Sequence, residues 1–270
     1  TMVLVPGPVE FRMGSPESEA ERYGNETSHQ KRISRGFAIG STHVTLEQYE
    51  RFAKNYGRSL GAPYDRDRRL PAVGISWFMA AAYCNWLSEV YGLSPCYDLA
   101  TWERYTPVRN GYRLPTEAEW ERAAAWDGTR HWRYGFVSDE IDTSRANLYL
   151  PPLVNPLGLT AYPETTPIGW FDGINSGPAN GLATQNSPSP TGCYDMSGNV
   201  WEWCHDWYAE DYYVSSPGTN PTGPSTGQYR VLRGGAWSTF ADTCRTVYRL
   251  GNSLPGSTSY AYGFRVARSQ

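Results

Sequence analysis

The sequence near the carboxyl end reads Arg233-Gly234-Gly235-Ala236-Trp237, then a run from Ser238 to Tyr262, then Gly263-Phe264-Arg265-Val266-Ala267-Arg268. The two flanking segments look like fixed motifs, whereas the run between them has neither helical nor strand periodicity. The run is rich in Tyr, Ser, Gly, Asn and Thr. Antibody-like binding surfaces use the same residues, because Tyr gives contact area at low entropic cost and small polar residues adapt their hydrogen bonds. This pattern predicts a binding surface on a fixed frame.

The composition is that of a globular chain with many turns. Its 270 residues suffice for one large domain or two small ones with a real core. The 27 Gly and 20 Pro predict many turns and few helices. The net charge of -3 argues against nucleic-acid binding through phosphates. The chain has no apolar run of roughly 20 residues, so no membrane span is predicted. The first residues are not a signal peptide as they stand, and cytoplasmic, phage-borne and cell-surface locations all stay open.

Local patterns predict three helices, each beginning at a hydroxyl side chain that can cap it. The predicted helices are 46–54 after Thr45, 77–91 after Ser76, and 116–124, where Thr116 and Glu119 form a capping box. The predicted strands are 2–13 as a pair broken at 6–8, 32–44, 200–207, 229–232 and 264–267. Segments 127–191 and 217–227 are predicted to be irregular.

The cysteine, glutamate and histidine side chains that could support catalysis or metal binding are interpreted as structural. The five cysteines lack paired spacing, so we expect them to be reduced and mostly buried (Cys84, Cys96, Cys193, Cys204 and Cys244). Glu117 and Glu121 are assigned to a solvated helix face and Glu119 to the capping box, rather than to acid–base catalysis. His205 is predicted to be a strand residue rather than a metal ligand, because no second spaced pair of ligands exists.

Several motifs occur together in one order along the chain. They are Met13-Gly14-Ser15-Pro16-Glu17, the segment 111–121 (GYRLPTEAEWE), the segment 195–203 (DMSGNVWEW), Arg233-Gly234-Gly235-Ala236-Trp237 and Gly263-Phe264-Arg265-Val266. This combination spans nearly the whole chain and resembles the formylglycine-generating-enzyme-like (sulfatase-modifying factor) superfamily. The resemblance implies an α+β chain with an elaborated C-type lectin fold, few helices and much irregular structure. It also implies a single domain over residues 1–270.

The resemblance also bears on catalysis. In the enzymes of this superfamily, two cysteines shortly after the Arg-Gly-Gly motif bind copper and carry out the oxidation. Here the first of those positions falls near Thr239, and only Cys244 remains. A soft monovalent metal favours two thiolates, which one cysteine does not supply. The resemblance therefore implies a non-catalytic protein with no required cofactor. An oxidase or related enzyme of the superfamily is the alternative, and an accessory subunit is a third.

Among the non-catalytic members, the chain resembles the variable proteins of diversity-generating retroelements. These systems rewrite adenines, often in AAC or AAT codons, which then cannot encode Lys, Glu, Gln, Met or Trp. The run 238–262 contains none of these five residues. The resemblance implies a variable region over about 233–268 that binds a protein or surface glycan. The positions expected to vary and bind ligand are Ser238, Thr239, Phe240, Ala241, Asp242, Thr246, Tyr248, Leu250, Gly251, Asn252, Ser253, Ser257, Thr258, Ser259, Tyr260, Ala261 and Tyr262.

A fixed frame is expected to hold this region through Arg233, Trp237, Arg245 and Phe264, with Gly234-Gly235 in a tight or positive-φ backbone. The other interpretation of the run is an irregular loop whose aromatic residues are partly buried for stability. The sequence does not identify the ligand or the oligomeric state.

The segment 195–203 has two interpretations. Superfamily members bind calcium here, which by resemblance implies the side chains of Asp195 and Glu202 and the carbonyls of Gly198 and Val200 as ligands. Two carboxylates and two carbonyls suit a hard cation. Alternatively, Asn199 and Glu202 hydrogen-bond the loop and no ion is held.

Overall fold

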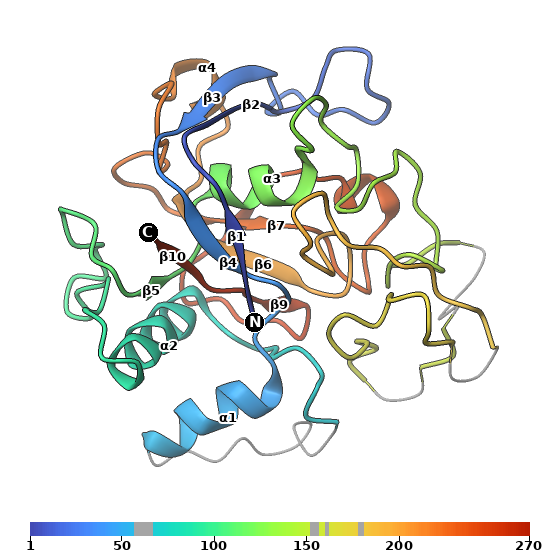
Figure 1. Ribbon diagram of the computed structural model, residues 1–270, viewed down its shortest axis with the longest axis horizontal. Coiled ribbons are helices and arrows are strands. Elements are labelled where there is room, and N and C mark those ends of the chain that lie inside the picture. The colour runs from blue at the N-terminus through green and yellow to red at the C-terminus, as the bar shows by residue number, and fades with distance from the viewer. Residues whose placement is uncertain (57–66, 152–156, 160–161, 178–180) are drawn as a thin grey trace.

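The computed structural model describes residues 1–56, 67–151, 157–159, 162–177 and 181–270 (Figure 1). Three sheets organise this part of the chain. The first has the strand order β1 (Met2–Val5), β4 (Phe37–Gly40), β10 (Ala267–Ser269), β5 (Tyr112–Arg113). The second pairs β2 (Val9–Met13) with β3 (His29–Ile33). The third has the order β8 (Leu250–Ser253), β7 (Arg230–Arg233), β6 (Trp201–Trp207), β9 (Tyr262–Gly263).

The three predicted helices form where their caps predict them. They are α1 (Leu46–Asn55), α2 (Trp77–Val90) and α3 (Glu117–Ala125). Thr45 and Thr116 each accept a hydrogen bond from the backbone of the third helical residue, and both belong to capping boxes. Two single-turn helices are not predicted, α4 (Tyr212–Ser215) and the 3-10 helix η1 (Ala241–Cys244), because single turns have too few residues to show periodicity.

Several strand predictions are wrong in extent or pairing. The strands of 2–13 do not pair with each other: β1 pairs with β4, and β2 pairs with β3. The segment 32–44 is not one strand, because the chain leaves β3 after Ile33 and enters β4 at Phe37. The terminal strand lies at 267–269 rather than 264–267. Of the predicted loop 127–191, positions 152–156, 160–161 and 178–180 lie outside the described residues.

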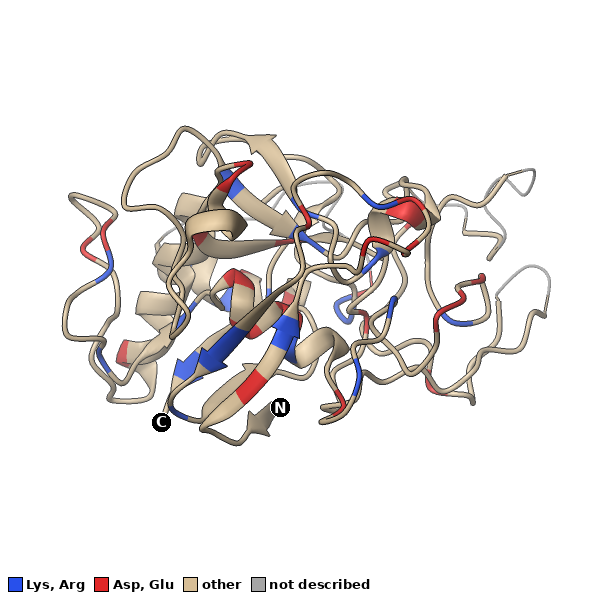
Figure 2. Cartoon of the chain, turned by 90° about the horizontal axis from the view of Figure 1, so that it is seen from above, with Lys and Arg blue, Asp and Glu red and all other residues tan. Residues whose placement is uncertain are grey.

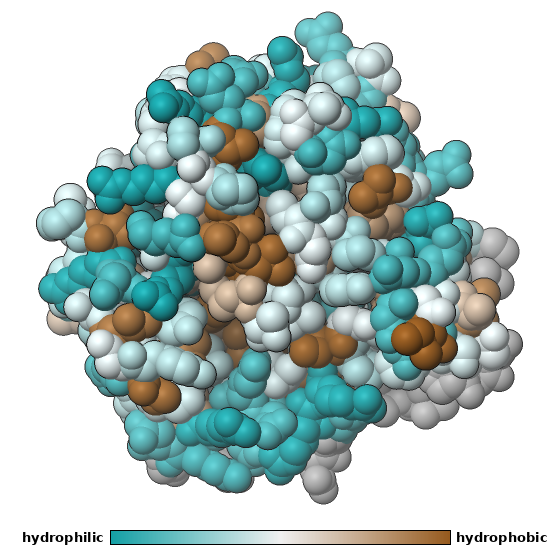
Figure 3. Space-filling model, viewed as in Figure 1, coloured by the Kyte–Doolittle hydropathy of each residue, from teal (hydrophilic) through white to brown (hydrophobic). Residues whose placement is uncertain are grey.

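Aromatic residues join the helices to the third sheet. The indole Nε1 of Trp77 in α2 donates to the carbonyl of Cys204 at 2.9 Å, and Nε1 of Trp203 in β6 donates to the carbonyl of Ile75 at 2.7 Å. These two bonds satisfy polar atoms inside an apolar core. α1 buries one face through Leu46, Tyr49, Phe52 and Ala53. Its other face is hydrophilic, as the lower edge of Figure 3 shows. The core therefore fixes β6, which pairs with β7 and β9, the strands at the two ends of the run.

The prediction about the cysteines is confirmed. All five cysteines are free and buried, as expected. Basic and acidic residues are scattered over the chain, often near one another (Figure 2). Among the described residues, no helix is both long and apolar enough for a membrane crossing.

Candidate binding surface

The Arg-Gly-Gly motif fixes the backbone at the end of β7. Gly234 and Gly235 have φ of 94° and 77°, in the left-handed region that favours glycine, as the sequence predicted. A Cβ on Gly235 would lie 2.5 Å from the Cys244 Sγ, closer than any side chain tolerates. The motif is therefore required for close packing of the chain against the start of the run.

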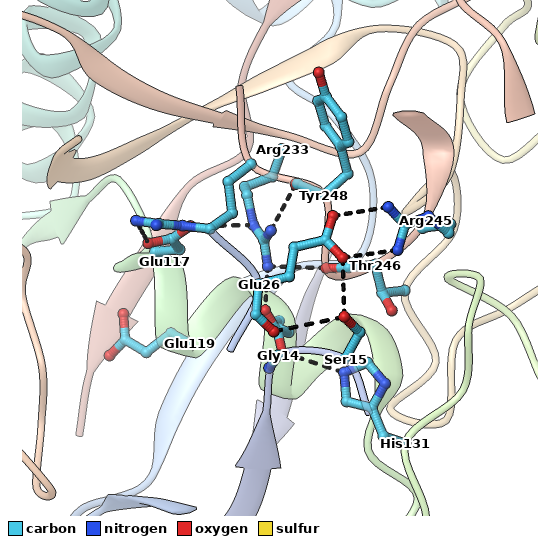
Figure 4. A network of polar contacts seen from close by, with 12 residues as sticks. Gly14, Ser15, Glu26, Glu117, Glu119, His131, Arg233, Arg245, Thr246 and Tyr248 are labelled. Atoms are coloured by element: carbon cyan, nitrogen blue, oxygen red, sulfur yellow. Dashed lines mark hydrogen bonds and ion pairs between the residues drawn. The ribbon is translucent and has the colours of Figure 1, made fainter. Parts of the chain in front are cut away.

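Buried arginine–glutamate pairs connect the run to the rest of the protein (Figure 4). The Arg233 guanidinium contacts the Glu121 carboxylate and donates to the carbonyls of Thr246 at 2.8 Å and Tyr248 at 2.6 Å. It thus joins α3 to the backbone of the run. These bonds place Arg233 in the frame, as we expect from the sequence.

Two arginines within the run are also part of this frame. Arg245 donates to both oxygens of Glu26, at 2.9 and 2.7 Å, and to Glu19 at 2.8 Å. Arg249 donates to Glu117 at 2.7 and 3.0 Å. Phe264 is fully buried, as expected of a frame residue, whereas Trp237, the fourth residue of the predicted frame, is only half-buried.

The assignment of Glu117 and Glu121 to a solvated helix face is therefore wrong. Both side chains are buried, and Glu121 pairs with Arg233 while Glu117 pairs with Arg249 of the run. Burial raises the pKa of Glu121, but Arg233, His131 and the Gly14 N–H more than offset this and leave the pKa at about 2. These carboxylates are structural anions that neutralise the arginines of the frame.

The run itself presents a mixed surface. Of the predicted ligand-binding positions, five are exposed: Ser238, Phe240, Asn252, Thr258 and Tyr260; Leu254 and Gly256 of the run are exposed as well. The half-buried positions are Thr239, Ala241, Asp242, Tyr248, Leu250, Gly251, Ser257, Ser259, Ala261 and Tyr262. Most of the predicted ligand-binding positions thus have solvent-accessible side chains or backbone, and their role in binding stays a prediction.

Three predicted variable positions need correction. Thr246 is 0% exposed, and its hydroxyl donates to the carbonyls of Trp132 at 2.8 Å and Arg133 at 3.2 Å. Ser253 is 3% exposed and lies 2.8 Å from the Tyr262 hydroxyl. A Cβ on Gly251 would lie 2.2 Å from the Tyr208 ring. Because these positions are packed, free variation there is incompatible with this backbone.

Aromatic residues outside the run extend its surface. Phe240 is 53% exposed and lies against Tyr149, with 5.1 Å between ring centroids. Tyr162 is 62% exposed and lies 5.6 Å from both Trp237 and Tyr260. Neither Tyr149 nor Tyr162 is predicted to bind ligand, since both come from a segment without periodicity. We call this set of five rings the aromatic surface.

Thr239, the residue expected where the enzymes have their first thiol, lies beside Cys244. Thr239 Oγ1 lies 3.9 Å from Cys244 Sγ. The Thr239 hydroxyl accepts a hydrogen bond from the Ala236 N–H at 2.9 Å, so the threonine closes the turn. Burial raises the pKa of the Cys244 thiol to about 12, which keeps it protonated at neutral pH. The residues present here do not fit the two-thiolate copper site of the enzymes.

The predicted calcium ligands fit a cation only in part. The Asp195 Oδ1 is buried without a partner, which suits a cation. The Glu202 carboxylate is instead bonded by Arg265 at 2.6 and 2.7 Å, and His43 Nε2 lies 3.0 Å from it. Among the described residues, no cluster of three or more His, Cys, Asp or Glu is arranged to hold a metal. Calcium at Asp195, Gly198, Val200 and Glu202 therefore stays a prediction.

Thermal unfolding tests whether calcium binds at this site. If calcium binds at Asp195, we expect a higher melting temperature in calcium than in chelator, because a ligand that binds only the folded state stabilises it. The variant Asp195→Asn should remove that difference. Equal melting temperatures of the natural chain in both buffers would contradict calcium binding.

His205 lies in β6, as predicted. Burial lowers the pKa of its imidazole well below the ordinary value, and nearby arginines lower it further, so the ring is neutral. Its nearest aromatic neighbours are Trp77 and Tyr97. It therefore packs in the core.

With this geometry established, the comparison with known proteins assigns the class. Residues 1–270 match the sulfatase-modifying factor enzyme 1-like domain family, and the chain belongs to that family. Its fold is the α+β, elaborated C-type lectin fold of the formylglycine-generating-enzyme-like proteins. The match does not test whether the chain is one domain, so this stays a prediction.

Three particular proteins show how far the likeness extends. The chain is 32% identical to the formylglycine-generating enzyme of Streptomyces coelicolor, over 98% of this chain and 88% of that enzyme. It is 32% identical to the serine/threonine-protein kinase pkn1 of Chlamydia pneumoniae, over 99% of this chain but only 38% of the kinase. The solved structure of Treponema denticola variable protein 1 superposes with a TM-score of 0.71 and 27% identity, covering 100% of this chain and 95% of that one.

Proposed function

We propose that this chain is a non-catalytic display protein that binds a protein or surface glycan through the exposed part of residues 238–262. The observation that carries the proposal is the separation of frame from surface. Arg233, Arg245 and Arg249 are buried in ion pairs, whereas Phe240 and Tyr260 between and beyond them face solvent. Side chains at such exposed positions can change without loss of the core. Exposed aromatic residues are also the side chains that dominate binding energy at interfaces.

We further propose that a retroelement diversifies the run. The absence of Lys, Glu, Gln, Met and Trp from 238–262 and the likeness to Treponema denticola variable protein 1 support this. Sequencing the neighbouring DNA tests it. We expect a near-copy of the segment that encodes the run, differing chiefly at adenines, beside a reverse-transcriptase gene. The segment that encodes residues 200–233 serves as a control and should have no such copy. A repeat that differs equally at all four bases would contradict the proposal.

An oxidase of the family is the second candidate, favoured by the 32% identity to the Streptomyces enzyme. Thr239 in place of the first thiol counts against it, since Cys244 alone offers one sulfur ligand. Copper-dependent oxygen uptake by the natural chain with a cysteine-containing peptide would favour this candidate and overturn the first.

Substitution of two nearby tyrosines tests which side chains of the run are exposed and which are packed. Tyr260→Ser should leave the melting temperature within about 2 °C of the natural chain, because its ring is 40% exposed. Tyr262→Ser should lower the free energy of unfolding by roughly 2 kcal/mol and the melting temperature by about 5 °C. The Tyr262 ring packs on Trp203 at 5.4 Å and its hydroxyl contacts Ser253. Calorimetry measures both melting temperatures. An equal decrease in the two variants would favour a loop whose aromatic residues are packed for stability.

A further inference from the structure

A half-open cavity of about 400 Å³ lies at the carboxyl end of β10, away from the run. It is bounded by the turn after β3, the loop that precedes β5, the first turn of α3 and the loop at 220–222. These segments meet around the C-terminus on the left of Figure 1, whereas the orange-red turn of η1 lies on the right. No residue of 238–262 lines the cavity.

Arginines give the cavity an unbalanced charge. Arg35, Arg104, Arg109 and Arg113 line it, and the acidic residue in its lining is Glu119. Arg113 engages both oxygens of Glu119, at 2.6 and 2.7 Å, so this carboxylate neutralises Arg113. Figure 2 shows basic segments gathered beside the C-terminus.

Among the described residues, the other three arginines form no ion pair, although the charge of Arg104 also acts on the carboxylates of Glu119 and Asp206. The Arg109 guanidinium stacks on the Tyr105 ring, 3.3 Å from its centroid, and donates to the Pro95 carbonyl. Arg35 and Arg104 make no hydrogen bond or ion pair with any described residue. Three like charges around one cavity repel each other, and a bound anion would relieve that repulsion.

The lining also favours a small organic ligand. A volume of about 400 Å³ lies within the range of small-molecule sites. Ile33, Val108 and Pro221 add apolar surface beside the arginines. The arginine guanidinium is planar and matches phosphate oxygens with paired donors. The overall charge of -3 argues against a nucleic acid as the ligand.

From these observations we propose that this cavity, the arginine pocket, binds a small phosphate monoester, with the phosphate on Arg35 and Arg104 and its organic body on the apolar wall. This site is independent of the proposed display surface. It would give the chain a second ligand whose binding does not depend on the sequence of the run.

Isothermal titration calorimetry with phenyl phosphate and with inorganic phosphate tests the proposal on the whole chain. We expect phenyl phosphate to bind more tightly than inorganic phosphate, since only the ester contacts the apolar wall. Arg104→Ala and Arg35→Ala should each weaken phenyl phosphate binding by about tenfold, because each removes a charged hydrogen-bond donor.

Arg51→Ala is the matched control. It removes the same charge from an exposed site on α1, where Arg51 pairs with Glu47, and should leave binding unchanged. Arg35 is exposed and bonds to no described residue, so Arg35→Ala should keep the melting temperature even if Arg104→Ala disturbs folding. No measurable heat with either anion at about 10 mM would overturn the proposal. The proposal would also be overturned if Arg35→Ala and Arg104→Ala bound phenyl phosphate as tightly as Arg51→Ala does.

Discussion

Replacing Arg233 with methionine is expected to lower the free energy of unfolding by about 3–5 kcal/mol. The guanidinium is 0% exposed and neutralises the buried Glu121 carboxylate. Methionine fills similar volume but leaves that carboxylate without its cation and the carbonyls of Thr246 and Tyr248 without their donor. Leaving a buried charge uncompensated costs more than the lost hydrogen bonds alone.

Urea unfolding measures the effect, and two variants control it. Arg51→Met breaks the exposed pair with Glu47 and should change stability by less than about 0.5 kcal/mol. The double variant Arg233→Met/Glu121→Gln should recover part of the loss, because it removes the unpaired charge. A loss in Arg233→Met as small as that in Arg51→Met would show that the frame does not depend on this pair.

The same variant should change the response to acid. Glu121 has a folded pKa of about 2, below its ordinary value of 4.5. It therefore stabilises the fold above pH 4.5, and that contribution is lost as the pH falls from 4.5 towards 2. Without Arg233 the folded pKa should rise, so the contribution of Glu121 to the stability gained between pH 2 and 5 should shrink.

Replacing Thr239 with cysteine is expected to create a Cu(I) site that the natural chain lacks. The Thr239 Oγ1 already lies 3.9 Å from Cys244 Sγ, so a sulfur at that position would complete a pair of soft ligands. Burial holds the pKa of the Cys244 thiol at about 12, and a bound cation would favour its thiolate. We expect stoichiometric Cu(I) capture by Thr239→Cys and none by the natural chain.

Competition with a chromogenic Cu(I) chelator measures this capture. Thr258→Cys is the control, because it adds one thiol at an exposed position of the same run. If Thr239→Cys competes no better than Thr258→Cys, the two positions do not form a ligand pair. Stoichiometric Cu(I) capture by the natural chain itself would favour the oxidase. The expected result would show that the threonine at position 239 is the one residue that prevents Cu(I) binding here.

The sequence alone determined features that depend on near neighbours. The caps at Thr45 and Thr116 act within one helical turn, so their residues predict α1 and α3. The positive φ of Gly234 and Gly235 follows from the residue type where the backbone must turn sharply. The motif order also indicated the family, because five separated motifs occurred in one order.

Only the tertiary structure decided which side chains of the run face solvent. Thr246 and Ser253 have the same polar composition as their exposed neighbours, yet they are buried. The run lacks a period, so no local pattern separates its inner from its outer positions. The partners of the frame are also remote: Glu121 precedes Arg233 by 112 residues. Such pairs form only when the fold brings distant segments together, and this is why Glu121 looked like a surface residue of α3.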